Sequence, residues 1–416
     1  MGFLSFHRFL PRLTAAVLLA AACLGIAAQN ADSTALFQQI GGIAADLGSI
    51  TGFREKKPVA CDMIDRSRLK RFMENRIEEE VKPEEIRAEE TTLKKFGFLP
   101  RDYDLRASTV ELLAEQAAAF YDFKKKKLFV LDASSDALQQ TALVHELAHA
   151  LADQQFNLGG FIKHSGPSDD ASTARMAVIE GQASWLMAEY AARKAGQSLK
   201  DNPTLLQMMA NADGGSGQFP VFDKAPPYIR ETLLFPYTKG MLFQQAVFER
   251  MDRAAFAEVF RRPPETTQQI LHPALYFERK KPTSPPLPEP PPAARHWHEL
   301  AGGTVGELDH AILMRQYADK EKAAVLAPKW AGGRYRVIEQ SKGGPTVLQY
   351  SSDWESPGDA RGFFEVYKAV LRGKWKTVTV TSDEPDRFAG QGDGEPFLLR
   401  VDGSRVSSVE GPVPQT

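Results

Sequence analysis

The sequence has very little cysteine. Only Cys23 and Cys61 occur among its 416 residues. So small a number excludes a disulfide framework and leaves no basis for a cysteine zinc site or a Cys–His nucleophile. The fold must therefore rely on its hydrophobic core.

The sequence also lacks an excess of charge of either sign. It has 51 basic and 53 acidic side chains and a net charge of −2. A chain so nearly neutral creates no field that would attract nucleic acid or an anionic membrane, so we expect no nucleic-acid partner. Its 43% apolar and 25% charged residues are ordinary for a water-soluble globular protein. The length predicts at least two domains.

Long apolar runs are missing everywhere except at the beginning of the chain. Residues 13–28 are largely apolar, follow the basic residues His7, Arg8 and Arg12, and end in small side chains. This order is typical of a secretory signal peptide, which we place at residues 1–28. The run is shorter than the about 20 residues of a membrane-spanning helix. We therefore expect a secreted or periplasmic protein without a membrane span.

Two ways of processing this signal remain open. Cleavage near Ala27 or Ala28 would release a soluble protein, and we favour this outcome. Alternatively, residues 20–23 (AAAC) resemble a bacterial lipobox, in which a lipid on Cys23 would anchor the protein to the cell envelope. The usual Leu three residues before the cysteine is Ala here.

Charged residues dominate the segment after the signal. Residues 66–98 combine helical periodicity with runs of charge, which predicts one or two solvated helices broken near Pro83. We therefore assign residues 29–100 to an N-terminal charged helical region. This region is either a removable inhibitory pro-segment or a permanent part of the catalytic domain.

Residues 101–281 have the pattern of a mainly helical domain with one β-hairpin. We expect a helix at 108–119, a hairpin formed by 120–122 and 128–131 around a basic turn, helices at 136–156 and 170–194, and a helix at 228–251 interrupted at Pro236.

A proline tract follows this domain. Residues 282–292 (PTSPPLPEPPP) can form neither a helix nor a sheet ladder, so 282–294 is expected to be a semi-rigid extended linker. Beyond it, residues 295–416 predict a small α+β domain. We expect its helices at 307–317 and 358–371 and its strands at 335–339, 346–350, 377–381, 397–401 and 406–409.

Three polar residues interrupt an apolar helix at 141–152 (TALVHELAHALA). His145 and His149 lie four residues apart, on the same helical face, so both imidazoles can reach one tetrahedral ion. Glu146 points about 100° away around the helix axis. It can therefore act as the general base toward a zinc-bound water, as in HExxH zinc peptidases. The sequence thus predicts a Zn²⁺ site with Glu146 as a catalytic residue.

A catalytic zinc site needs a third protein ligand. The best candidate is Glu180, in a second mostly apolar helix whose small neighbours Ala177 and Gly181 would let two helices approach closely. Asp153 is the rival, but it lies a further 5.4 Å turn along the first helix. Asp153 is better suited to a supporting role, in which it either accepts a hydrogen bond from a zinc-bound histidine or caps a helix end.

These residues resemble the gluzincin metallopeptidases, which use two histidines and a downstream glutamate. HELAHALADQQF at 145–156 and EGQA at 180–183 carry this likeness. More closely, the chain is similar to a poorly characterised set of secreted or lipoprotein HExxH proteins of bacteria and archaea. The matching pieces are AAAFYDFKKKKLFVLD before the motif, LFPYTKG at 234–240 and PPETTQQILHPALY at 263–276.

The resemblance implies an α+β, zincin-like fold for residues 101–281, mainly helical with a small upper sheet. It also implies that the strand at 128–131 lies above the motif helix and pairs with an extended peptide. Many gluzincins have Asp four residues after the ligand glutamate, where this chain has Ser184. Hydrogen bonding to a zinc-bound histidine must then come from elsewhere, and Asp153 is eligible.

An oxyanion stabiliser is also needed, because the tetrahedral intermediate of peptide hydrolysis develops negative charge. Tyr237 and His272 are the candidates, each beside a proline that would fix the local chain. Tyr237 could instead cap a helix, and His272 could be a turn residue.

The function expected from these residues is zinc-dependent hydrolysis of a peptide or protein substrate outside the cytoplasm. Two alternatives stay open. One is a catalytically silent zincin-fold scaffold of the cell envelope, although zinc binding alone does not require Glu146. The other is a zinc amidohydrolase that acts on a non-peptide amide.

Overall fold

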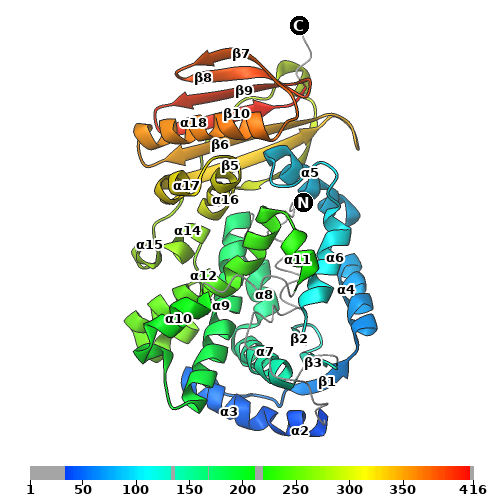
Figure 1. Ribbon diagram of the computed structural model, residues 1–416, viewed down its shortest axis with the longest axis vertical. Coiled ribbons are helices and arrows are strands. Elements are labelled where there is room, and N and C mark those ends of the chain that lie inside the picture. Colours follow the sequence, from blue (N-terminus) through cyan, green and yellow to red (C-terminus); the bar gives the residue numbers. More distant parts are fainter. Residues whose placement is uncertain (1–32, 133–135, 167, 211–218, 413–416) are drawn as a thin grey trace.

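The structure is a computed structural model that describes residues 33–132, 136–166, 168–210 and 219–412. The predicted signal peptide, with Cys23, lies outside these residues. Within them, no helix has the length and apolar character needed to cross a membrane. The chain is mixed α+β, with a helical N-terminal part and a β-sheet domain at its C-terminal end (Figure 1). The expected α+β class is confirmed at this level.

Residues 33–116 form a row of helices that precedes the hairpin. They are α2 (Ser33–Gln38), α3 (Ile40–Thr51), α4 (Arg66–Glu80), α5 (Pro83–Phe96) and α6 (Leu105–Gln116). The break near Pro83 is confirmed, because Pro83 is the first residue of α5, where its missing N–H costs nothing. The left-handed Gly97 ends α5.

A three-stranded sheet lies beside these helices. It consists of β1 (Ala60–Ile64), β2 (Ala119–Asp122) and β3 (Lys127–Leu131), in the order β1-β3-β2. The antiparallel hairpin of β2 and β3 is confirmed. The parallel strand β1 was not predicted, and it pairs with β3 along its whole length. The expectation that β3 pairs with a peptide is therefore wrong, because β1 and β2 occupy both of its edges.

Several contacts join residues 33–100 to the rest of the chain. Besides the strand β1, Arg76 donates to Asp122 at 2.8 Å, and Arg87 forms a bidentate pair with Glu339 at 2.6 and 2.9 Å. Asp122 ends β2, and Glu339 ends a strand of the C-terminal domain. These contacts favour a permanent part of the fold over a removable pro-segment.

Three long helices form the centre of the molecule. They are α7 (Asp136–Phe156), α9 (Asp169–Lys194) and α12 (Pro227–Met251), and α9 packs against both of the others. Helix α9 is buried over most of its circumference, as its apolar sequence requires. The Ser168 side chain caps it by accepting the N–H of Ala171.

The predicted interruption of α12 at Pro236 is wrong, because the helix runs unbroken through this residue. A proline inside a helix removes one backbone hydrogen bond and costs about 3 kcal/mol. Pro236 is buried, and α12 lies along α9 in close contact. We attribute the continuity of α12 to this burial, which offsets the cost of the proline.

Shorter elements connect or follow the long helices. They are α8 (Leu158–Lys163), η1 (Leu199–Asp201), α10 (Pro203–Ala210), α11 (Pro220–Lys224), η2 (Asp252–Ala254), α13 (Ala255–Arg261), α14 (Thr267–Leu271), α15 (Pro273–Glu278) and η3 (Pro292–Ala294). The proline tract is extended and lies against the C-terminal sheet. Thr283 N–H donates to Ala331 O at 2.8 Å, and the Gln349 side chain donates to Pro288 O.

The C-terminal domain is a seven-stranded antiparallel sheet with helices. The strand order is β4-β5-β6-β10-β9-β8-β7. Its elements are β4 (His298–Thr304), α16 (Glu307–Tyr317), α17 (Lys320–Leu326), η4 (Ala327–Lys329), β5 (Trp330–Glu339), β6 (Thr346–Trp354), α18 (Pro357–Gly373), β7 (Val378–Glu384), β8 (Arg387–Gly392), β9 (Glu395–Asp402) and β10 (Arg405–Glu410). Strands β4 and β8 were not predicted, because the two glycines in each weaken the strand pattern.

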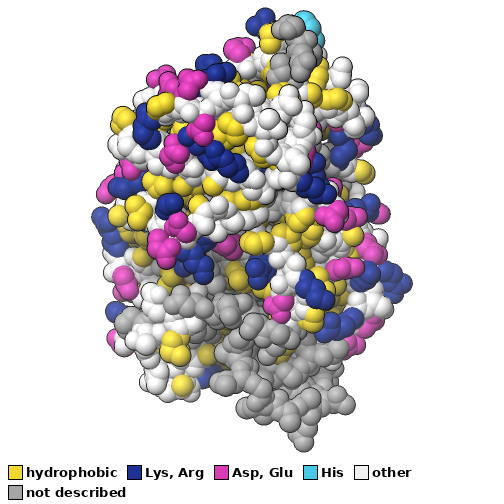
Figure 2. Space-filling view, turned by 45° about the horizontal axis from the view of Figure 1, so that its top comes forward, with side chains coloured by type: hydrophobic (Ala, Val, Ile, Leu, Met, Phe, Trp, Pro, Cys, Tyr) yellow, Lys and Arg dark blue, Asp and Glu magenta, His cyan; other side chains and the backbone are white. Residues whose placement is uncertain are grey.

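Charges on the surface show no separation by sign. Figure 2 shows basic and acidic side chains interspersed over one face of the molecule. This mixture agrees with the near-zero net charge of the sequence.

Candidate metal centre

Helix α7 carries the three residues of the HExxH motif into the interior. His145, Glu146 and His149 are 0%, 3% and 4% exposed. The two imidazole rings lie with their centroids 4.6 Å apart, as expected for residues one turn apart on one face. Buried imidazole and carboxyl groups are costly unless they find partners.

Helix α9 provides that partner. Glu180 is 1% exposed, and its Oε2 lies 3.2 Å from Nε2 of both His145 and His149. One ligand atom from each of the three residues lies within 4.8 Å of the others. The structure therefore brings the three predicted ligands together from two helices.

The protonation states of this group follow from its burial and its charges. Burial lowers the pKa of His145 to about 4, against the opposing hydrogen bond with Glu180. Burial acts to raise the pKa of Glu180, but His149 and His145 outweigh it and hold that pKa well below its usual value. Burial raises the pKa of Glu146 to about 8. Glu180 outweighs the effect of burial at His149 and raises the pKa of that imidazole. Glu180 and His145 thus have the forms in which these side chains bind metals, ionised and neutral, whereas His149 would lose its proton when an ion binds.

One buried atom of this group indicates that it suits a metal ion. Oε1 of Glu180 has no hydrogen-bond partner among the described residues. Leaving buried polar atoms unpaired is costly in a site that holds only protein. Two imidazole nitrogens and one carboxylate oxygen form a donor set typical of catalytic Zn²⁺ sites with one open position. The residues present therefore fit the ion that the sequence predicts.

Of the two oxyanion candidates, the structure places Tyr237 beside the metal group. Tyr237 comes from α12, is 7% exposed, and its ring centroid lies 6.1 Å from that of His145.

His272 has a different environment, between α14 and α15. Its Nε2 lies 2.9 Å from Oε1 of Glu307, and this carboxylate raises the pKa of the imidazole. Helix α14, which ends just before His272, contacts the beginning of α9, where Thr267 donates to Asp170. Asp170 lies ten residues before Glu180, a distance of about 15 Å along the helix axis. No contact among the described residues joins His272 to the metal group. Its contacts favour a role at the junction with the C-terminal domain.

The partners of Asp153 fit the expected capping role and not the expected hydrogen bond to a zinc-bound histidine. Tyr121 Oη and Lys126 Nζ donate to Oδ2 of Asp153 at 3.0 and 2.6 Å, and the Leu158 N–H donates to Oδ1 at 2.9 Å. Both oxygens are thus bonded to groups other than His145 and His149. Asp153 joins the end of α7 to the hairpin instead.

The edge strand β2 contributes a residue that the sequence analysis missed. The backbone N–H of Tyr121 faces the Glu146 carboxyl group and acts to lower the pKa of Glu146. The hydrogen-bond pattern of the hairpin explains why this N–H points away from β3. Leu131 N–H donates to Ala118 O, so the backbone groups of Ala118 face β3. Backbone groups alternate along a strand, so those of Ala119 and Tyr121 face away from β3. The HExxH glutamate therefore lies at the outer edge of β2.

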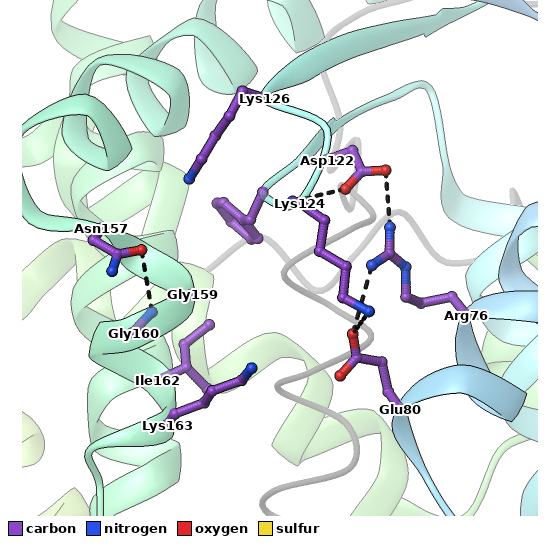
Figure 3. A pocket seen from close by; sticks show the side chains of 11 residues that line it. Arg76, Glu80, Asp122, Lys124, Lys126, Asn157, Gly159, Gly160, Ile162 and Lys163 are labelled. Atoms are coloured by element: carbon purple, nitrogen blue, oxygen red, sulfur yellow. Dashed lines mark hydrogen bonds and ion pairs between the residues drawn. The ribbon is translucent and has the colours of Figure 1, made fainter.

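A cavity of about 490 Å³ begins where β2 ends. Its walls come from α4, the β2–β3 turn and α8 (Figure 3). The lining residues are Arg76, Glu80, Asp122, Phe123, Lys124, Lys126, Asn157, Gly159, Gly160, Ile162 and Lys163. The ring of Phe123 also lies against His149, with 6.3 Å between centroids. The sequence predicts Lys124 and Lys126 only as part of a basic turn, and it indicates no role for Lys163.

Comparison with known proteins concerns the C-terminal domain alone. A family model described as a domain of unknown function, DUF8575, matches residues 295–416. These are the residues that the sequence predicts for that domain. Searches of curated proteins and of solved structures gave no match to the chain.

Proposed function

We propose that this protein is a zinc-dependent metallopeptidase of the gluzincin type that acts outside the cytoplasm. The observation that carries the proposal is the meeting of His145, His149 and Glu180, with Glu146 beside them at a strand edge. Buried imidazoles on one helix and a buried carboxylate on another are unusual without a shared ion.

The roles of the side chains follow from their positions. His145, His149 and Glu180 would hold Zn²⁺, which polarises a scissile carbonyl and lowers the pKa of a water molecule. Glu146 is not among the three ligands. The positive charge of a bound ion would favour its carboxylate form, which takes the proton of the attacking water and passes it to the leaving amine. Tyr237, beside His145, is placed to donate a hydrogen bond to the developing oxyanion.

Substrate binding is assigned to β2 instead of β3. Within the described residues, β2 pairs with a strand on one edge only, and the backbone of Ala119 and Tyr121 faces the side of Glu146. All four residues of β2 are buried, so the site would have to open before an extended peptide could add to this edge through main-chain hydrogen bonds, which require little sequence preference. This geometry favours a peptide over a small amide substrate.

The test combines metal analysis with cleavage of an unstructured protein. The purified chain without its signal peptide should contain about one zinc ion, as a three-ligand site with an open position requires. It should cleave casein, lose this activity to a chelator and regain it with added zinc. Retained zinc with no cleavage of casein or of a peptide library would support the scaffold alternative. Hydrolysis of small amides alone would support the amidohydrolase.

A further inference from the structure

The cavity at the end of β2 continues the line along which a peptide would lie. The backbone N–H of Tyr121 in β2 faces Glu146, and the next two residues, Asp122 and Phe123, line the cavity. A neighbouring substrate residue is therefore within reach of the cavity. Its volume of about 490 Å³ lies within the roughly 300–1,000 Å³ of typical ligand pockets.

Most of the charges around this cavity neutralise one another. Arg76 and Lys124 both pair with Glu80, and Arg76 also pairs with Asp122. Oδ1 of Asp122 accepts two further backbone N–H groups from the turn. The two acidic residues of the lining are thus fully engaged with two of its four basic residues.

Two lysines remain on the cavity. Figure 3 shows Lys126 and Lys163 pointing into it from opposite sides. Lys126 bonds Asp153 through one of its three ammonium protons, and its side chain is 52% exposed. Lys163 is exposed and makes none of the close ion pairs of the described residues, although its charge acts on Glu80 and helps to lower the pKa of that carboxyl. An incoming carboxylate would find ammonium donors on two sides.

We propose that this cavity is a specificity pocket for an acidic side chain, Asp or Glu, of the substrate next to the scissile bond. Lys163 and Lys126 bind the carboxylate, while Phe123 and Ile162 pack against its methylene groups. The inference rests on the proposed peptidase function and adds the class of sequence that the enzyme would cleave.

A peptide-library cleavage profile of the zinc-loaded chain tests the proposal. One position beside the scissile bond should be enriched in Asp and Glu by about tenfold, the effect of one charge-assisted hydrogen bond. Lys163→Met should remove most of this enrichment, and Lys163→Glu should reverse it toward Lys and Arg. Lys70→Glu, on the exposed face of α4 and outside the cavity, makes the same charge change and should leave the profile unchanged.

Binding to the Glu146→Gln variant separates this inference from the proposed function. Fluorescent hexapeptides of alanine with a single Glu, or a single Gln, at each position would be compared by anisotropy. One Glu position should bind about tenfold tighter than its Gln counterpart, and Lys163→Met should abolish the difference. Cleavage without acidic preference, or equal binding of the Glu and Gln peptides, would overturn the pocket assignment. Acidic preference in binding without any cleavage would retain the pocket and overturn the peptidase.

Discussion

Gly181 of α9 and Gly240 of α12 lie with their backbones in direct contact. A Cβ atom on Gly181 would be 2.1 Å from the carbonyl carbon of Gly240, and one on Gly240 would be 2.1 Å from Ala177 O. Such distances exclude any side chain at either position. Because Glu180 is adjacent to Gly181, this crossing fixes where the proposed third metal ligand lies.

Gly181→Ala should therefore damage both the fold and the metal site. We expect a loss of about 3 kcal/mol in the free energy of unfolding, the upper range for overpacking, together with reduced zinc content. Urea unfolding and metal analysis would measure these effects. Gly42→Ala is the matched control, since a Cβ on Gly42 in α3 meets nothing within 4 Å. Unchanged stability and zinc content in Gly181→Ala would refute the role of the crossing.

Glu180→Gln and Asp153→Asn should show which residue binds zinc and which one only stabilises the fold around the site. The first change removes a charged ligand, so zinc content should fall well below one ion per chain. The second weakens the bonds to Lys126 and Tyr121, which should cost about 1–3 kcal/mol of stability with zinc retained. If Asp153→Asn loses zinc and Glu180→Gln keeps it, the ligand assignment is wrong.

A chain that begins at residue 101 should not fold. It would lose β1, expose the edge of β3, and break the bond of Asp132 N–H to Ile64 O. The unpaired strand favours aggregation. Circular dichroism and size-exclusion chromatography would show an unfolded or aggregated protein. A monomeric, cooperatively melting fragment would instead support the removable pro-segment.

His310 should make the protein less stable in acid. Burial lowers its pKa to about 4, and the neutral ring lies between Gly306 O at 2.6 Å and Tyr350 Oη at 2.5 Å. In the unfolded chain the pKa is about 6.5, so unfolding takes up a proton between these values. The contribution of His310 is therefore present above pH 6.5 and lost as the pH falls toward 4, up to about 3 kcal/mol.

His310→Gln should flatten this dependence. Urea unfolding of both proteins at pH 7 and pH 4.5 would compare them, because the remaining groups titrate alike in each. A wild-type protein that loses no more stability than the variant would show that His310 is not the cause.

The predictable part of the site was the part encoded by local periodicity. His145, Glu146 and His149 interrupt one apolar helix, and Glu180 interrupts another, so the need for a shared partner is visible in sequence. The same periodicity predicted α7 and α9, and two short aromatic and branched runs around a basic turn predicted the hairpin. That His145, His149 and Glu180 lie together could be predicted only from the argument that buried polar side chains need partners.

The unpredicted features depend on contacts between distant segments. Strand β1 exists through pairing with β3 more than 60 residues later, so its own five residues carry a weak signal. The partners of Asp153 come from the hairpin, whose position over α7 is not encoded locally. For the same reason, the sequence could not show that β2, and not β3, has its edge at Glu146.

The central claim is that Glu146 works beside a zinc ion held by His145, His149 and Glu180. The most direct test is the rate of peptide cleavage by wild-type protein and by Glu146→Gln, each with its zinc content measured. We predict about one zinc per chain in both proteins and a loss of at least about 100-fold in rate for the variant, the usual effect of removing a general base. Equal rates at equal zinc content would contradict the claim.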